Sequence, residues 1–367
     1  MLKLKGFEII PLSVPLEKPI ITSFGTMKNR QGCLLQLTTD EGIIGWGESW
    51  INYPWWGLKE RVATLGAICE SIIGEEVVNP ATLTNRLFND FGAVARQWGA
   101  VGPVSQAISA VDLAAWDIVG QSKNLPVYQL FGGTVNSVRA YGSGIGADQV
   151  ELRLRQAIDH GLESVKIKIG FGDSQDLATV KKARDIWGNR PLMLDVNQGW
   201  DLEEALIMFS KLVEYQPYWI EEPLQADNFK DLIILSRRST LPIAAGENVY
   251  GDMFGELARS GAIHYLQPDL AKMGGFSRGI EISKLAQKGV LTVVPHVFGT
   301  ALSVICAGHF NAATGAPWLE LDMNDNPLRE YLLEDGPHIR NGHLVLSDQP
   351  GWGVNIDQEA LARLRYN

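Results

Sequence analysis

Residues 191–197 read PLMLDVN, an apolar run that ends in a carboxylate and an amide, and this stretch decides how the rest of the chain is interpreted. The arrangement returns twice further along, in YWIEEP at 218–223 and in PIAAGE at 242–247. Asp195, Glu221 and Glu247 therefore follow one another at steps of 26 residues. A step of that size holds one strand and one helix, the repeating unit of a parallel sheet.

The same step reaches further polar residues on both sides of these three. Lys166 and Lys168 come before them in VKIKIG, and three residues come after them: Asp269 in LQPDL, His296 in VVPHV and Glu320 in WLELD. In parallel barrels the active site lies at the C-terminal ends of the strands. Polar residues that recur at successive strand ends therefore predict an active site there.

Eight strand-like runs alternate with helical patterns from residue 138 onward. They are VRAYGSG, SVKIKIG, PLMLDVN, YWIEEP, PIAAGE, HYLQPDL, LTVVPHV and WLELD. Strict alternation predicts an α/β fold with a parallel sheet, and eight repeats predict closure into a TIM-type (β/α)8 barrel.

The chain on either side of the barrel has other patterns. Strand-like runs before residue 50 and helical spacing from residue 58 predict an α+β domain at 1–133. The barrel then occupies 134–330. The segment 331–367 falls outside the eightfold pattern, so we expect it to return to the first domain.

Composition limits the classes of partner. A net charge of -10 opposes binding to nucleic acid or to an anionic membrane, because both need clustered lysine and arginine. No apolar run is long enough to span a bilayer, and the N-terminus has no signal-peptide pattern. The three cysteines are sparse, which is typical of reduced core residues. We therefore expect a cytoplasmic enzyme.

The three evenly spaced carboxylates suit a hard divalent cation. Oxygen ligands from Asp195, Glu221 and Glu247, with no cysteine or histidine among them, favour Mg²⁺ and leave positions for substrate and water. Each carboxylate alone could equally be a helix cap or a surface charge, but three in matching register favour the metal site. Asn197 could hydrogen-bond a ligand or shape a turn.

Candidate acids and bases flank these carboxylates. Lys166 and Lys168 project to the same side of one strand, and their repulsion would lower the pKa of one lysine so that it acts as a base. Alternatively, both lysines extend to solvent. Asp269 and His296 end adjacent strands and could form a dyad in which the carboxylate orients the imidazole. Glu320 could donate a hydrogen bond if it is protonated, or serve only in packing.

In their order, these motifs resemble the mandelate racemase subgroup of the enolase superfamily. The resemblance rests on Lys-x-Lys, DVNQ, IEEP, GEN, QPD and PHV, and on AISAVDLAAWDIVGQSKNLPVYQLFGG and PGWGVNID outside the barrel. It implies a capping domain over a modified (β/α)7β-type barrel. It also implies roles: Lys166 contacts the substrate carboxylate, Lys168 is one base, His296 is the opposite acid or base, and Glu320 donates to an enediolate.

The chemical step that the resemblance implies is Mg²⁺-dependent removal of the proton α to a carboxylate. Loss of a β-hydroxyl would then make the enzyme a sugar acid dehydratase that forms a 2-keto-3-deoxy acid, which is our first hypothesis. Reprotonation would make it a racemase or epimerase of a 2-hydroxy acid, and a non-catalytic binding barrel is a third possibility. Muconate cycloisomerases use a lysine on strand six. Lys272 lies three residues beyond Asp269, and we expect it to leave that strand.

Two segments outside the barrel are expected to close over the site. Residues 20–30 form one, and residues 50–58, WINYPWWGL, form the other. We predict substrate contacts from four residues: Trp50, Tyr53, Ser143 and Asn197. The aromatic run could equally be a contact between copies of the chain, and we expect a homo-oligomer.

Overall fold

Eight parallel strands form a barrel in the computed structural model, which describes residues 2–23 and 25–366. The strands are β4 (Ser137–Ile145), β5 (Val165–Lys168), β6 (Leu192–Asp195), β7 (Ile220–Glu221), β8 (Ile243–Ala245), β9 (Tyr265–Leu266), β10 (Thr292–Val293) and β11 (Leu319–Asp322). Neighbours pair in chain order from β4 to β10, and β11 pairs with β4. Each predicted run overlaps one of these strands.

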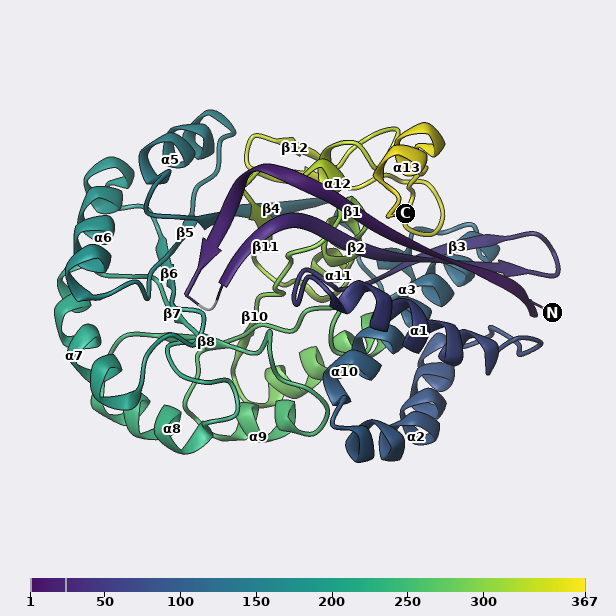
Figure 1. Cartoon of the computed structure of the whole chain (residues 1–367), viewed down its shortest axis with the longest axis horizontal. Helices are drawn as coiled ribbons and strands as arrows, with labels where there is room; N and C mark the ends of the chain where they lie inside the picture. The colour runs from purple at the N-terminus through teal and green to yellow at the C-terminus, as the bar shows by residue number, and fades with distance from the viewer. Residues whose placement is uncertain (1, 24, 367) are drawn as a thin grey trace.

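Seven helices lie outside the barrel, one after each of the first seven strands (Figure 1). They are α5 (Val150–Asp159), α6 (Asp173–Trp187), α7 (Leu202–Leu212), α8 (Phe229–Arg238), α9 (Met253–Arg259), α10 (Gly275–Lys288) and α11 (Ala301–Thr314). A 3-10 turn, Val213–Tyr215, follows α7, and only the short α12 (Pro327–Glu330) follows β11. The modified (β/α)7β pattern is therefore confirmed.

An antiparallel sheet and four helices precede the barrel. The strands are β1 (Leu4–Thr22), β2 (Gly25–Thr39) and β3 (Ile44–Ser49), paired in that order. The helices are α1 (Gly57–Glu70), α2 (Pro80–Trp98), α3 (Val101–Ser122) and α4 (Val127–Leu130). The α+β prediction for this part of the chain is confirmed.

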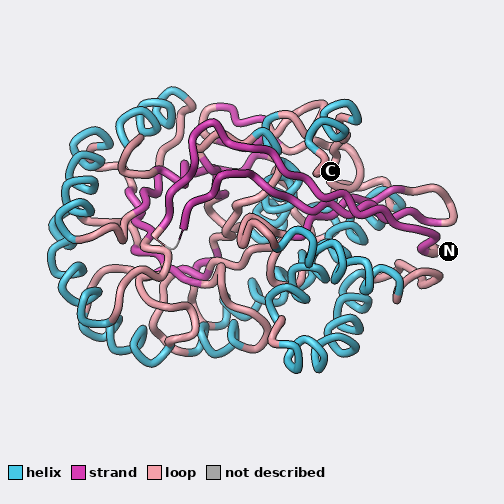
Figure 2. The backbone as a smooth tube through the Cα atoms, viewed as in Figure 1, coloured by secondary structure: helices cyan, strands magenta, loops and turns pink. Residues whose placement is uncertain are grey.

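The segment 20–30, which we expect to close over the site, belongs to the far end of the long β1–β2 hairpin. The pairing shifts register between Pro15 and Ile20 and then resumes, with Ile20 opposite Met27 and Ile21 opposite Thr26. The hairpin bends over the barrel, as the two adjacent magenta strands in Figure 2 show.

The C-terminal segment contacts both parts of the molecule. Strand β13 (His343–Val345) pairs with β12 (His338–Arg340) and also with β4 of the barrel. After helix α13 (Gln358–Leu364), Arg365 forms a bridge with Leu12 of β1. The boundaries between the three predicted domains stay a prediction.

Strand β3 lies so close to helix α3 that side chains are excluded between them. A Cβ atom on Gly47 would lie 2.0 Å from the carbonyl oxygen of Ala110. We expect Gly47→Ala to lower the free energy of unfolding by about 1–3 kcal/mol, the usual cost of overpacking, in urea denaturation. Gly66→Ala in α1 is the control, because its Cβ would meet only Ile9 at 3.8 Å. Equal stability of the two variants would contradict the close approach.

His309 of α11 joins α4 to the C-terminal segment. Its Nδ1 accepts from the Tyr128 amide and its Nε2 contacts the Trp352 carbonyl, both at 3.2 Å, so the ring is neutral. Burial lowers its pKa to about 3. The unfolded chain takes up this proton near pH 6.5, so folding stability should fall as pH drops from about 6.5 towards 3. His309→Gln should weaken this pH dependence in urea titrations, and an unchanged profile would contradict it.

Candidate active site

Strand register brings the predicted residues together at one end of the barrel. Lys168 pairs with Asp195, and Asp195 pairs with Glu221, across β5, β6 and β7. Because alternate residues of a strand share a face, Lys166 and Lys168 both point inward. Lys166 is fully buried, which excludes the alternative that both lysines extend to solvent.

The two lysines pair with carboxylates in the barrel floor. Lys166 Nζ contacts Glu221 Oε1, and it lies 2.7 Å from Glu320 and 3.8 Å from Asp195. Lys168 Nζ lies 2.5 Å from Asp195 Oδ2 and 2.7 Å from Asn197 Oδ1. Each ammonium therefore has an anionic partner.

These pairings overturn the expected depression of a lysine pKa. Burial and the repulsion from Lys166 lower the pKa of Lys168, but Asp195 and Glu247 together outweigh them, so the pKa is raised. The pKa of Lys166 is likewise raised, because nearby carboxylates, chiefly Glu221 and Glu320, outweigh burial. Carboxylates on neighbouring strands therefore decide the charge of both lysines.

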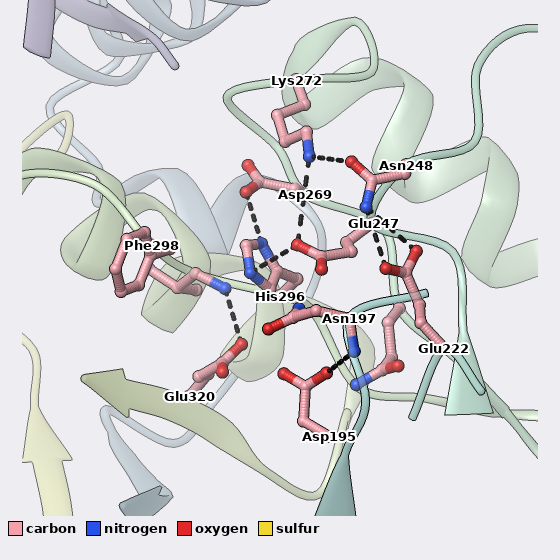
Figure 3. A network of polar contacts seen from close by, with 12 residues as sticks. Asp195, Asn197, Glu222, Glu247, Asn248, Asp269, Lys272, His296, Phe298 and Glu320 are labelled. Atoms are coloured by element: carbon pink, nitrogen blue, oxygen red, sulfur yellow. Dashed lines mark hydrogen bonds and ion pairs between the residues drawn. The ribbon is translucent and has the colours of Figure 1, made fainter. Parts of the chain in front are cut away.

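His296 and Asp269 lie within hydrogen-bond distance, as their strand ends predict. His296 Nδ1 is 2.7 Å from Asp269 Oδ2, and Nε2 is 2.7 Å from Glu247 Oε2 (Figure 3). Burial alone would lower the pKa of His296, but Glu247, Glu320 and Asp269 hold it well above its usual range. Both residues lie three positions beyond β9 and β10, where Pro268 and Pro295 supply no ladder N–H.

Glu320 accepts hydrogen bonds rather than donating them. Ser143 Oγ donates to Oε1 at 2.5 Å, and the Val297 amide donates to Oε2 at 3.0 Å. Although burial would raise its pKa, Lys166 and His296 lower it to about 2. The expected donating role would require a substrate carboxylate to draw Lys166 away.

Further hydrogen bonds fix the orientation of Glu221, and residues with strained backbone lie at the same end of the barrel. Glu221 Oε2 accepts from Gln267 Nε2 at 2.5 Å and from Trp219 Nε1 at 3.1 Å, which leaves Oε1 towards the site. Three non-glycine residues at this end have positive φ: Asn197 at 48°, Gln198 at 63° and Glu222 at 39°. Such backbone strain is concentrated at functional sites.

The residues present fit a divalent cation. Six buried carboxyl groups gather here: Asp195, Glu221, Glu222, Glu247, Asp269 and Glu320. They face four cationic side chains, Lys166, Lys168, Lys272 and His296. Six carboxyl groups thus outnumber four cationic side chains. Burial, with Glu247 and Asp195 nearby, raises the pKa of Glu222 well above its usual range, and burial raises the pKa of Glu221 to about 7, so a bound cation would stabilise the charged forms of both carboxyl groups. The donors of the predicted ligands are all oxygen, as Mg²⁺ prefers.

The side chains of the three predicted metal ligands point towards lysine and histidine side chains. Within residues 2–23 and 25–366, no three His, Cys, Asp or Glu side chains are arranged to hold a metal ion. Asp195 faces Lys168, Glu221 faces Lys166 and Glu247 faces His296. The ligand set of Asp195, Glu221 and Glu247 stays a prediction.

A cavity of about 550 Å³ opens above this floor. Lys168, Glu247, His296 and Glu320 border it, and so do all four predicted substrate contacts: Trp50, Tyr53, Ser143 and Asn197. The hairpin end contributes Thr22, Gly25 and Thr26. Its capping side is rich in apolar groups, namely Ile20, Trp50, Tyr53, Pro54, Trp56 and Phe298.

A larger hollow of about 1000 Å³ lies between the first sheet and the C-terminal segment. Of the acidic groups that border it, Asp117 has both oxygens bound to the backbone amides of Trp46 and Trp352. Its lining contains no lysine, arginine or histidine. It is therefore poorly suited to a carboxylate substrate.

Sequence reasoning missed one residue that borders the cavity. Lys272 does leave strand β9, as expected, but the following turn brings its side chain back to the cavity. Arg30, at the end of the segment 20–30, is not among the residues that border the cavity; it is buried and contacts Asp322 at the end of β11. The QPDLAKMGG motif carried a signal for Lys272, since a tight turn after a strand end returns side chains to that end.

Comparison with known proteins places the chain among enolase-like proteins. Residues 149–360 match "Enolase C-terminal domain-like", and residues 7–132 match "Mandelate racemase / muconate lactonizing enzyme, N-terminal domain". The D-galactarolactone cycloisomerase of Agrobacterium fabrum is 30% identical and is covered over 95% of each chain. The arabinonate dehydratase of Saccharolobus solfataricus is 31% identical over 88% of this chain and 87% of its own.

Solved structures agree with this assignment of fold. An enolase from Bradyrhizobium, crystallised with magnesium and mandelic acid, superposes with a TM-score of 0.88. It is 29% identical, and the superposition covers 100% of this chain and 99% of that one. In the part of the chain that the structure describes, no helix has both the length and the hydropathy needed to cross a membrane.

The excess of carboxylates leads to a metal-binding prediction. At about a hundredfold excess over its Kd, Mg²⁺ should raise the free energy of unfolding by about 3 kcal/mol, since it binds the folded state. Differential scanning fluorimetry, with KCl matching the ionic strength, measures the rise, and Glu247→Gln should diminish it. Glu163→Gln is the control, because Glu163 precedes β5 at the other end of the barrel and pairs with Arg139. No shift in the wild-type protein would contradict the site.

Proposed function

Because the chain belongs to the mandelate racemase / muconate lactonizing enzyme family, we propose that it is a Mg²⁺-dependent sugar acid dehydratase. The observation that carries the proposal is that two candidate bases border one cavity: Lys168, which contacts Asp195, and His296, which contacts Asp269. The relatives described as a cycloisomerase and a dehydratase of sugar acids support the substrate class.

The first step is removal of the proton α to the substrate carboxylate. The chemistry that bound Mg²⁺ supplies is Lewis-acid stabilisation of that carboxylate, and Asp195, Glu221 and Glu247 would hold the ion. Lys166 lies in the floor and neutralises the charge that develops on the substrate oxygens. Once Asp195 holds the ion it would no longer stabilise the charged form of Lys168, so the pKa of Lys168 would fall and the neutral amine could take the proton.

The second step is loss of the β-hydroxyl. Asp269 holds the His296 ring so that Nε2 faces the cavity side of Glu247. With its raised pKa, His296 is protonated at neutral pH, so it can deliver a proton to the departing hydroxyl. The products are an enol, which becomes a 2-keto-3-deoxy acid, and water.

The second candidate is a racemase of a 2-hydroxy acid. The apolar capping side of the cavity favours it, because aromatic and aliphatic groups pair poorly with the many hydroxyls of an open-chain sugar. The Bradyrhizobium neighbour was crystallised with mandelic acid, a 2-hydroxy acid with an aromatic ring. A non-catalytic binding barrel is the third.

We also propose that the protein is a cytoplasmic homo-oligomer. All three cysteines are buried and free, as in a reducing compartment. Trp55 and Trp56 are 75% and 64% exposed, an unusual feature for a monomer surface, and contact between copies would cover them. The partners that we propose are therefore further copies of the chain at this surface and a small carboxylate substrate in the barrel.

Incubation of sugar acids and 2-hydroxy acids with the Mg²⁺-loaded protein in D₂O separates these candidates. We expect keto acid formation, and a loss of about 100-fold or more in turnover for Lys168→Met and for His296→Asn. Lys182→Met, an exposed lysine on α6, should be unaffected. Recovered substrate with α-deuterium and no keto acid would favour the racemase. If no acid reacts with the wild-type protein or with either variant, the non-catalytic binding barrel is the remaining candidate.

A further inference from the structure

A third lysine borders the cavity, and the two steps above give it no part. Lys272 follows β9 in a tight turn, in which its amide donates to the Asp269 carbonyl at 3.0 Å. It is only 2% exposed, yet its side chain lines the cavity beside Glu247 and His296. A lysine so deeply buried is costly unless its charge is used.

The Lys272 ammonium has spare hydrogen-bonding capacity. Its Nζ donates to Asn248 Oδ1 at 2.8 Å and lies 3.9 Å from Glu247 Oε2, which is too long for a hydrogen bond. The Trp50 ring covers another side at 4.6 Å. An ammonium has three N–H donors, so Asn248 alone, the acceptor that the described residues provide, leaves capacity for a ligand.

The neighbours of Lys272 fix its place relative to the proposed bases. His296 Nε2 and Lys272 Nζ both approach the same oxygen of Glu247, at 2.7 Å and 3.9 Å (Figure 3). Lys168 Nζ instead contacts Asp195. Lys272 therefore lies on the His296 side. Lys168, Lys272 and His296 border the same cavity, so the ammonium of Lys272 is available to a substituent next to the α-carbon of a substrate bound there.

We propose that Lys272 is a specificity-determining residue that donates a hydrogen bond to an oxygen on the β-carbon of the substrate. This inference rests on the proposed function for the nature of the substrate, an acid held by its carboxylate. It names the group that the site selects: acids with an oxygen at the β-carbon bind, and acids with only carbon and hydrogen there bind weakly. Such an oxygen is also the group that a dehydratase must expel.

Isothermal titration of the Mg²⁺-loaded protein with glycerate and with lactate tests this inference. The two acids differ by one β-hydroxyl. We expect the wild-type protein to bind glycerate about tenfold more tightly, the usual worth of one hydrogen bond to a charged group. Lys272→Met should bind glycerate as weakly as lactate, while its affinity for lactate stays unchanged. Lys272→Gln, which keeps a neutral donor, should fall between them and serves if the methionine variant does not fold.

Two controls separate ligand recognition from a purely structural role. Lys182→Met removes an exposed positive charge on α6 and should keep the full preference for glycerate. Mg²⁺ titration without any acid should give the Lys272 variants an affinity no weaker than that of the wild type, because they lose a cation near Glu247. A fall in affinity for both acids alike, or a loss of Mg²⁺ binding, would mean that Lys272 only supports Asn248 and Glu247.

A wild-type protein that binds glycerate no more tightly than lactate, or binds neither, overturns the inference. Failure of the proposed function has a different signature. In that case no acid exchanges its α-proton or forms a keto acid, while the difference between glycerate and lactate still reports on Lys272.

Discussion

The structure depends on the burial of six carboxyl groups at one end of a barrel. Buried charges are tolerated only when they are paired, and each of these lies against a cation, an amide or a backbone N–H. Strand register is what allows this, since Lys168, Asp195 and Glu221 occupy successive rungs of one ladder. In the proposed function a divalent cation would stabilise the charged forms of these carboxyl groups, so the same burial that raises their pKa values and costs folding stability would support the chemistry. The proposed function therefore depends on an unfavourable burial of carboxyl groups that the barrel maintains.

The capping domain matters because it holds the loop that follows His296. Glu48 of β3 accepts hydrogen bonds from the amides of Thr300 and Ser303, which begin helix α11. Trp50 Nε1 and Asn52 Nδ2 both donate to the Phe298 carbonyl, at 2.9 and 2.7 Å. One short stretch of the first domain thus fixes both the first turn of α11 and the apolar side of the cavity. The side chains of this loop, such as Phe298, are thereby positioned as firmly as side chains on a strand.

The period of 26 residues was enough to predict the barrel and most of the site, because it reports where strands end, and parallel strands end on one side. It could not predict which charges pair. Lys168 was expected to repel Lys166, and instead Asp195 on the next strand stabilises its charged form. Glu320 was expected to donate, and Lys166 keeps it ionised. Both outcomes depend on side chains of neighbouring strands, whose partners depend on register, and the role of Glu320 towards a ligand stays a prediction. The segment 20–30 does border the cavity, as expected, although its residues belong to paired strands.

The two sides of the cavity differ in charge and polarity. The floor carries nearly all of the charge, and it comes from strand ends whose positions the barrel determines. The capping side is largely apolar and comes from the hairpin end, the Trp50 loop and Phe298. Lys272 lies where they meet, with its ammonium against the Trp50 ring and its donors towards Asn248 and the cavity. Nearby acidic groups, among them Glu247, keep the pKa of Lys272 raised despite burial, so the ammonium at that boundary is charged and keeps donors for a ligand. In the proposed function, selection between related acids would therefore depend on this boundary, whereas the proton transfer would depend on the floor.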